Sequence, residues 1–153
     1  MIISILVIAF IFILLWIGSK GPARSFNQLK SYLIDLDERG YNYSTLVINR
    51  IFSKKFIQFR KLIINKDEIN IQLAFPNANW SKNYYPQIIE LAINDNLDYK
   101  IVEENHYGEM EFIYINCNRD IDLAHSLIEK ILFEIFKEPR NSKFYALLDN
   151  ASN

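Results

Sequence analysis

Residues 56–75 read FIQFRKLIINKDEINIQLAF and contain two strand-like runs joined by a short polar link. The second run alternates apolar with polar or small residues, and its apolar positions are Ile69, Ile71, Leu73 and Phe75. A period of two is typical of a strand with one face on a core, and the link at 65–67 suits a hairpin. The stretch therefore predicts an antiparallel hairpin with strands over 56–64 and 68–75.

Three more strand-like runs flank this hairpin. Residues 43–52 precede it, and residues 98–104 and 109–117 follow it, joined by a turn at 105–108. Runs of strands separated by short links favour an antiparallel sheet. The sequence therefore predicts a mainly antiparallel sheet of five strands.

Helical patterns lie on either side of these strands. Ser25 and Gln28 form a capping-box pattern at the start of the first helix, and Gly40 is expected to end it in a left-handed conformation. A second helix begins at Pro86, which suits a first helical turn, and runs to about Asn96.

The third helix covers residues 120–137, where apolar residues recur at intervals of three and four until Pro139 ends the pattern. Residues 140–153 are expected to add a short helical turn and a polar tail. The predicted fold class is α+β, with an N-terminal transmembrane helix and about three helices packed on a five-stranded sheet.

The chain begins with an almost unbroken apolar run. Residues 1–17 read MIISILVIAFIFILLWI, carry no charge and span about 25 Å as a helix, with Trp16 placed to reach lipid headgroups. Lys20 and Arg24 follow, and positive flanks stay in the cytoplasm. A cleaved secretory signal would need a positive residue before the run, and none is present.

This pattern predicts a single-pass protein of the inner or cytoplasmic membrane whose folded part is cytoplasmic. The expected divisions are a transmembrane anchor over 1–18, a juxtamembrane linker over 19–24, a soluble α+β domain over 25–148 and a polar tail over 149–153.

The chemistry-bearing residues are few. Cys117 is the only cysteine, and it shows no metal-ligand spacing with His106 or His125. Four glycines leave little room for a phosphate-binding loop. A nucleophilic pair of Cys117 and His125 is conceivable, but a buried cysteine at the end of a core strand is the simpler interpretation. We therefore expect no enzymatic activity, metal, cofactor or small-molecule substrate.

Charge is distributed unevenly along the chain. Residues 1–66 hold ten Lys/Arg and three Asp/Glu, a net +7, whereas residues 67–153 hold seven and fifteen, a net −8. The asymmetry indicates either separate surfaces for an anionic and a cationic partner, or halves that interleave on folding and cancel.

Three segments are candidates for partner contact. The loop 77–85 is rich in aromatic residues, as contact hot spots are, although such rings can also fold back onto the core. Its candidates are Trp80, Tyr84 and Tyr85. The segment 103–111 gathers acidic residues around one turn and suits a cationic partner. Its candidates are Glu103, Glu104, His106, Glu109 and Glu111.

A basic hairpin is the third segment, formed by Lys54, Lys55, Arg60, Lys61 and Lys66. It suits a phospholipid surface better than nucleic acid, because no fold signature of a nucleic-acid reader accompanies it. Nucleic acid is therefore an unlikely partner.

A short N-terminal apolar anchor is followed by a capped helix, hairpins, a final amphipathic helix and an acidic half. In this general build, residues 25–137 resemble small bacterial immunity proteins that neutralise polymorphic or contact-dependent toxins, such as the TriTu-like group. The resemblance implies inhibition by occlusion, in which an acidic and aromatic surface covers a basic toxin active site. The implied function is a membrane-anchored protein-binding module; the alternative is a structural or assembly subunit of a cell-envelope complex.

Overall fold

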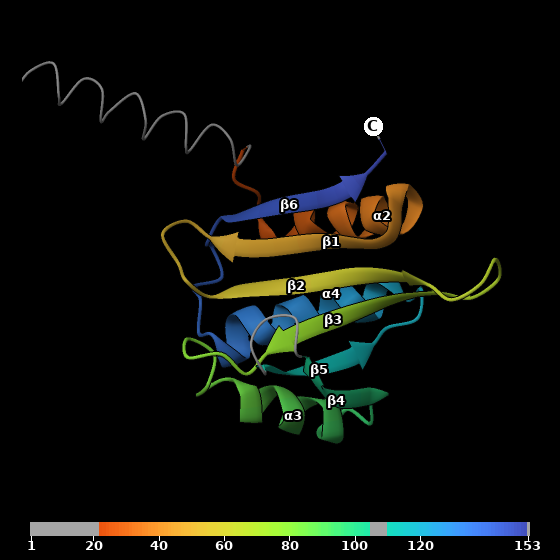
Figure 1. Cartoon of the computed structure of the whole chain (residues 1–153). Coiled ribbons are helices and arrows are strands. Elements are labelled where there is room, and N and C mark those ends of the chain that lie inside the picture. The colour runs from red at the N-terminus through yellow and green to blue at the C-terminus, as the bar shows by residue number, and fades with distance from the viewer. Residues whose placement is uncertain (1–21, 105–109, 153) are drawn as a thin grey trace, which may run out of the picture.

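The computed structural model describes residues 22–104 and 110–152. Its strands are β1 (Gly40–Arg50), β2 (Phe56–Ile63), β3 (Ile69–Pro76), β4 (Tyr99–Glu104), β5 (Met110–Asn116) and β6 (Phe144–Ala151). They form one sheet in the order β4-β5-β3-β2-β1-β6, and each neighbouring pair is antiparallel (Figure 1). The expected hairpin of β2 and β3 is therefore confirmed, and it occupies the centre of the sheet.

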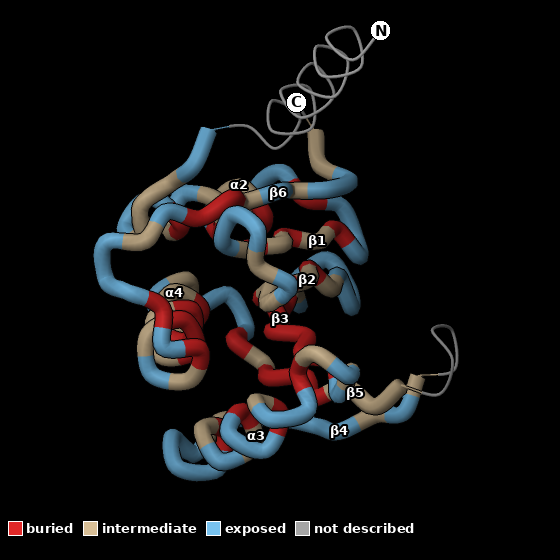
Figure 2. Tube along the Cα trace, turned by 90° about the vertical axis from the view of Figure 1, so that its left-hand side faces the viewer, coloured by how far each residue is buried: buried red, intermediate tan, exposed pale blue. Residues whose placement is uncertain are grey.

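The helices cover one face of this sheet. They are α2 (Leu29–Arg39), preceded by the short η1 (Phe26–Gln28), then α3 (Tyr85–Asn94), and α4 (Ile121–Glu129), which continues as the π-helical η3 (Lys130–Ile135). Figure 2 shows α3 and α4 on the same side of the strands, with buried residues between them, and α2 packs beside α4 against β1.

Alternation along the strands assigns each side chain to one of two faces. The helix-covered face carries the fully buried core of the strands, which includes Leu46, Ile48, Ile57, Phe59, Ile71, Leu73, Phe75, Ile113 and Ile115. The residues between them point the other way, because successive strand residues face opposite sides. We call this second surface the open face, since no helix of the described residues packs on it.

The predicted fold class is wrong in its strand count, and its membrane helix is not found among the described residues. Residues 144–151 form a sixth strand, β6, paired with β1 from Phe144 opposite Arg50 to Asp149 opposite Thr45. Within the described ranges, no helix is long and apolar enough to cross a membrane. The apolar run predicted as the anchor, residues 1–18, lies outside those ranges.

Gly40 also differs from expectation. It does not end α2 in a left-handed conformation, but begins β1 with an extended backbone (φ −68°, ψ 140°). Glycine is needed for space: a Cβ there would lie 2.4 Å from the carbonyl oxygen of Leu36 and 3.0 Å from Ser44 Cβ. The close approach lets the chain pass directly from α2 into β1.

The substitution Gly40→Ala is expected to lower the free energy of unfolding by about 1–2 kcal/mol, as over-packing of a tight site does. The new methyl group meets backbone rather than a flexible side chain, so α2 and β1 must separate. Urea unfolding measures the loss. Glu38→Ala, at an exposed position of the same helix, should change stability by less than about 0.5 kcal/mol, and equal effects of both variants would contradict the steric account.

Candidate functional site

The open face of the sheet contains a pocket of about 430 Å³. Its walls come from β1, β2, β3, β4, β5 and the loop before α3. Five aromatic side chains line it: Tyr43, Phe56, Trp80, Phe112 and Tyr114. We call it the sheet pocket. Its volume falls within the range of about 300–1,000 Å³ that is usual for binding sites.

Charged groups are fixed at one side of the sheet pocket. The Arg60 guanidinium lies over the Tyr114 ring, 3.8 Å from its centroid, and its Nε donates to Gln72 Oε1 at 3.2 Å. The Tyr114 hydroxyl donates to the Glu104 carboxylate, which also lies 3.8 Å from Arg60. Because each group has a partner, the pocket presents one guanidinium and one carboxylate in set positions.

Tyr114 is the centre of this arrangement. Burial raises the pKa of its phenol, and the Glu104 carboxylate raises it further, although Arg60 opposes them. The hydroxyl therefore stays protonated and keeps donating to Glu104 at neutral pH. Tyr114 also lines a second pocket of about 280 Å³, which continues along the open face past Gln72 to Asp98.

Trp80 forms the wall of the sheet pocket nearest the helices. Its ring packs against Phe56, with centroids 4.7 Å apart, and against Phe75 at 5.7 Å. The buried Ser81 holds the loop in place, because its hydroxyl accepts the Ala78 N–H at 2.9 Å. Packing and hydrogen bonds thus fix the Trp80 side chain before any partner binds.

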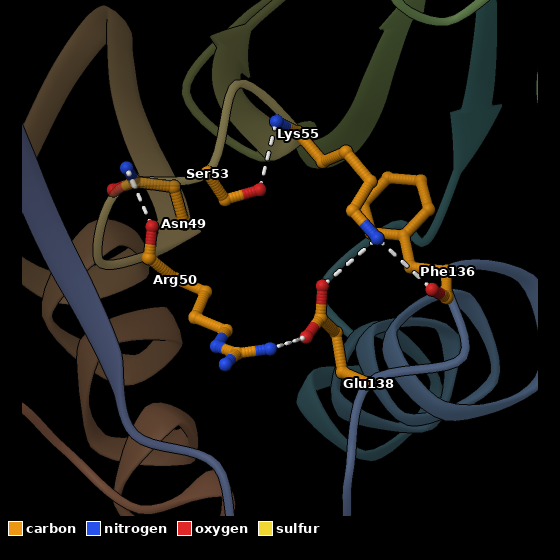
Figure 3. A network of polar contacts seen from close by, with 6 residues as sticks. All are labelled: Asn49, Arg50, Ser53, Lys55, Phe136 and Glu138. Carbon is orange, nitrogen blue, oxygen red and sulfur yellow. Dashed lines mark hydrogen bonds and ion pairs between the residues drawn. The ribbon is translucent and has the colours of Figure 1, made fainter.

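The buried carboxylate of Glu138 fixes Lys55, which lies against Phe136, and Phe136 in turn packs against Trp80. Glu138, whose side chain is 6% exposed, accepts a hydrogen bond from Arg50 at 2.7 Å and forms an ion pair with Lys55 at 2.9 Å (Figure 3). The Lys55 ammonium also donates to the Phe136 carbonyl and lies 5.7 Å from the Tyr84 ring. We call Arg50, Lys55 and Glu138 the Glu138 cluster.

The aromatic loop residues predicted to bind a partner occupy different environments. Trp80 lines the sheet pocket. Tyr84 is half-buried against Phe136, with centroids 5.0 Å apart. Tyr85 is buried in the core, and its hydroxyl has no hydrogen-bond partner among the described residues; burial and the nearby Glu111 carboxylate raise its pKa.

The predicted acidic turn is divided between the two faces of the sheet. Glu104 lies on the open face, whereas Glu103 and Glu111 lie opposite one another in the β4–β5 register on the other face. His106 and Glu109 fall outside the described residues. Of the predicted partner-binding residues, Trp80 and Glu104 therefore line the same pocket.

The basic hairpin is likewise dispersed. Arg60 belongs to the sheet pocket, Lys55 to the Glu138 cluster, and the Lys61 ammonium donates to the Asp37 carbonyl. Of the predicted membrane residues, Trp16 and Lys20 lie outside the described ranges. Arg24 exchanges backbone hydrogen bonds with Phe144, and its Nε donates to the Tyr32 hydroxyl at 2.9 Å.

No side-chain hydrogen bond joins Cys117 and His125 in the structure. Cys117 is buried, and burial raises its pKa to about 12, so its thiol stays protonated. His125 stacks on Phe26 at 4.2 Å and contacts the Phe26 carbonyl oxygen through Nε2 at 3.3 Å. In the part of the chain that is described, no cluster of His, Cys, Asp and Glu could hold a metal ion.

Sequence reasoning missed several walls of the sheet pocket. Phe112 and Tyr114 alternate with the core residues Ile113 and Ile115, and aromatic residues on the outward side of a strand are a usable signal. No pattern marked Tyr43, because it lies in an irregular part of β1 where the pairing with β6 shifts register.

Fold and site together define an α+β domain whose antiparallel sheet is covered by helices on one face and carries an aromatic pocket on the other. Comparisons of the chain with protein-family models, with curated proteins and with solved structures found no match.

Proposed function

We propose that this protein is a protein-binding module whose open face receives a basic surface of its partner. The observation that carries the proposal is the sheet pocket, in which aromatic walls surround a fixed guanidinium and carboxylate. Aromatic residues and arginine dominate the energetics of protein contacts, especially where they are held in position beforehand.

The charges of the open face favour a cationic partner. Three carboxylates, from Glu68, Asp98 and Glu104, line the two pockets beside two cations. Both cations lie against the ring of Tyr114, Arg60 at 3.8 Å and Lys100 at 5.8 Å from its centroid. A partner's lysine or arginine would therefore meet carboxylates and aromatic faces, which both attract cations.

The most concrete form of this function is immunity against a bacterial toxin by occlusion of a basic active site. Such a protein needs a preformed surface and no chemistry of its own. The location at the cytoplasmic membrane stays a prediction from the sequence.

The direct test is calorimetric titration of the full chain with the product of the neighbouring gene. We expect a complex with Kd in the micromolar range or tighter, and weaker binding as salt is raised, because salt screens exposed charges. Absence of a complex at micromolar concentrations would contradict the proposal.

The substitution Glu104→Gln is expected to weaken that complex about 5-fold, which corresponds to about 1 kcal/mol. It removes the carboxylate charge from the sheet pocket, while the amide oxygen can still accept the Tyr114 hydroxyl. The matched control is Glu103→Gln, which makes the same change on the preceding residue of β4 but on the other face. Equal weakening by both variants would show that charge alone, and not the sheet pocket, matters.

A further inference from the structure

Strand β4 is the last strand at its end of the sheet, and β5 is its neighbour in the pairing order. The Asn116 N–H donates to the Asp98 carbonyl at 2.8 Å, so the backbone groups of Asp98, and of every second residue after it, point toward β5. The backbone groups of Tyr99, Ile101 and Glu103 therefore point outward, away from the sheet.

The opposite edge of the sheet is protected. At the start of β6, Arg24 and Phe144 exchange two backbone hydrogen bonds, of 2.7 and 2.8 Å. At its end, Asn150 has a positive φ of 56° and the Ser152 N–H donates to the Arg39 carbonyl. Such devices prevent pairing with another chain.

Strand β4 has none of these devices. Its six residues contain no proline and no positive φ, and their register with β5 is regular. Two of its apolar side chains are exposed, Tyr99 by 37% and Ile101 by 45%. A regular and partly apolar edge of this kind is suited to adding a strand.

We propose that β4 pairs antiparallel with β4 of a second copy of this chain, about a two-fold axis that passes at Val102. In this register Ile101 lies opposite Glu103 of the second copy, and their outward backbone groups bond. Lys100 lies opposite Glu104 of the second copy, and the symmetry makes this pairing twice. Opposite charges facing one another across an antiparallel pair stabilise it.

The charges also select this register over its nearest alternative. A two-fold axis at Ile101 would place Asp98 opposite Glu104 of the second copy, and like charges directly opposite are destabilising. The axis at Val102 pairs the outward groups of Ile101 and Glu103 in both copies, and a two-fold pairing that uses the same edge of each copy closes as a dimer. Both open faces then lie on the same side of one continuous sheet, and this inference does not depend on the proposed function.

Crosslinking through an introduced cysteine tests the pairing. Val102 would meet its own symmetry mate as a non-hydrogen-bonded pair with Cα atoms about 4.5 Å apart, within disulfide reach. Ile101 would lie two residues out of register with its mate, beyond the limit of about 7 Å. The native Cys117 is buried, so the unsubstituted chain gives the background level of crosslinking.

The full chain is kept in solution with a mild detergent, because residues 1–17 are apolar, and is treated with oxidised glutathione. On a non-reducing gel we expect at least about ten times more crosslinked dimer from Val102→Cys than from Ile101→Cys, since a disulfide requires that geometry. Adding Lys100→Glu to Val102→Cys should reduce the dimer about 5-fold, as two like-charge pairs cost about 1 kcal/mol together.

Circular dichroism verifies that each variant is folded. No crosslinked dimer from Val102→Cys, equal amounts from both cysteine variants, or a preference for Ile101→Cys would each overturn the proposal. An unchanged yield after Lys100→Glu would overturn the proposed register.

Discussion

Replacing Tyr43 with glycine is expected to weaken partner binding about 30-fold, the loss typical of a contact hot spot worth about 2 kcal/mol. Tyr43 lines the sheet pocket, yet its side chain is 65% exposed, so its ring is available for contact. The same substitution should leave the free energy of unfolding unchanged or raise it by about 1 kcal/mol, because Tyr43 has a φ of 66° and glycine adopts this left-handed region without strain.

The opposite signs of these two effects make the prediction sharp. Asn96, Asn118 and Asn150 also have positive φ, which asparagine tolerates, and Phe52 and Lys137 have it in a turn and just after η3. Tyr43 has it inside strand β1, where a bulky residue adopts it rarely. The exposed Tyr43 ring contributes little burial energy to the fold. Packing therefore does not explain why a tyrosine occupies this strained backbone conformation. Strained residues persist more often at functional sites than elsewhere.

Titration with the neighbouring gene product measures binding, and thermal unfolding measures stability. Tyr41→Ala is the matched control, because Tyr41 is an exposed tyrosine two residues away that does not line the sheet pocket. Binding of Tyr43→Gly at native affinity would exclude Tyr43 from the interface, and a large loss of stability would show that its ring holds the fold.

The centre of the sheet could be predicted because its strands have one buried face. The alternation of Ile71, Leu73 and Phe75 reflects that burial directly. Strand β6 was missed because it lies at an edge, where its face is only partly covered. Its apolar residues Phe144, Leu147 and Leu148 have helical spacing, and Leu147 is exposed in the sheet.

Several charged residues of the basic and acidic halves pair with one another in the fold. Arg119 binds Asp37 at 2.6 Å, and Lys30 forms an ion pair with Asp122. Arg50 and Lys55 from the basic half likewise hold Glu138 from the acidic half. For these residues the two halves of the chain interleave on folding, so their charges do not form separate basic and acidic surfaces. Sequence reasoning could not predict such pairs, because the partners lie far apart in the chain.

The candidate site was only partly predictable for a geometric reason. Glu103 and Glu104 are adjacent in sequence, but a strand sends successive side chains to opposite faces. Trp80 and Glu104 are 24 positions apart, yet both line the sheet pocket because β3, β5 and β4 are neighbours in the sheet. Local composition therefore identified single residues and missed their grouping.

The substitution Glu138→Gln is expected to lower the free energy of unfolding by about 2 kcal/mol at pH 7. The loss is smaller than for a fully buried ion pair because the Arg50 side chain is 46% exposed. Arg50 and Lys55 would lose their common anion, and Lys55 has little access to water in its place, with a side chain that is 26% exposed. Glu134→Gln, at an exposed position of η3, makes the same change without such partners and should alter stability by less than about 0.5 kcal/mol.

The pH dependence of this loss is a second signature. Burial alone would raise the pKa of Glu138, but hydrogen bonds from Arg50 and Lys55 outweigh it and hold the pKa below its usual range. The stabilisation is therefore complete above the unfolded pKa of about 4.3 and disappears as the pH falls through the lower pKa of the folded state. In urea unfolding, the free energies of unfolding of the native protein and of Glu138→Gln should converge as the pH is lowered from 7 to 3. A difference that stays constant with pH would contradict the ionic mechanism.

The Glu138 cluster also connects stability to the sheet pocket. Lys55, held by Glu138, lies 5.3 Å from the ring of Phe136, and Phe136 packs edge-on to Trp80 at 6.4 Å. Loss of the anion should release Lys55 and loosen the Trp80 wall. Glu138→Gln is therefore expected to weaken partner binding as well, even though Glu138 does not line the pocket. If Glu138→Gln lost the pH-dependent stability but bound the partner with native affinity, the position of Trp80 would not depend on the Glu138 cluster.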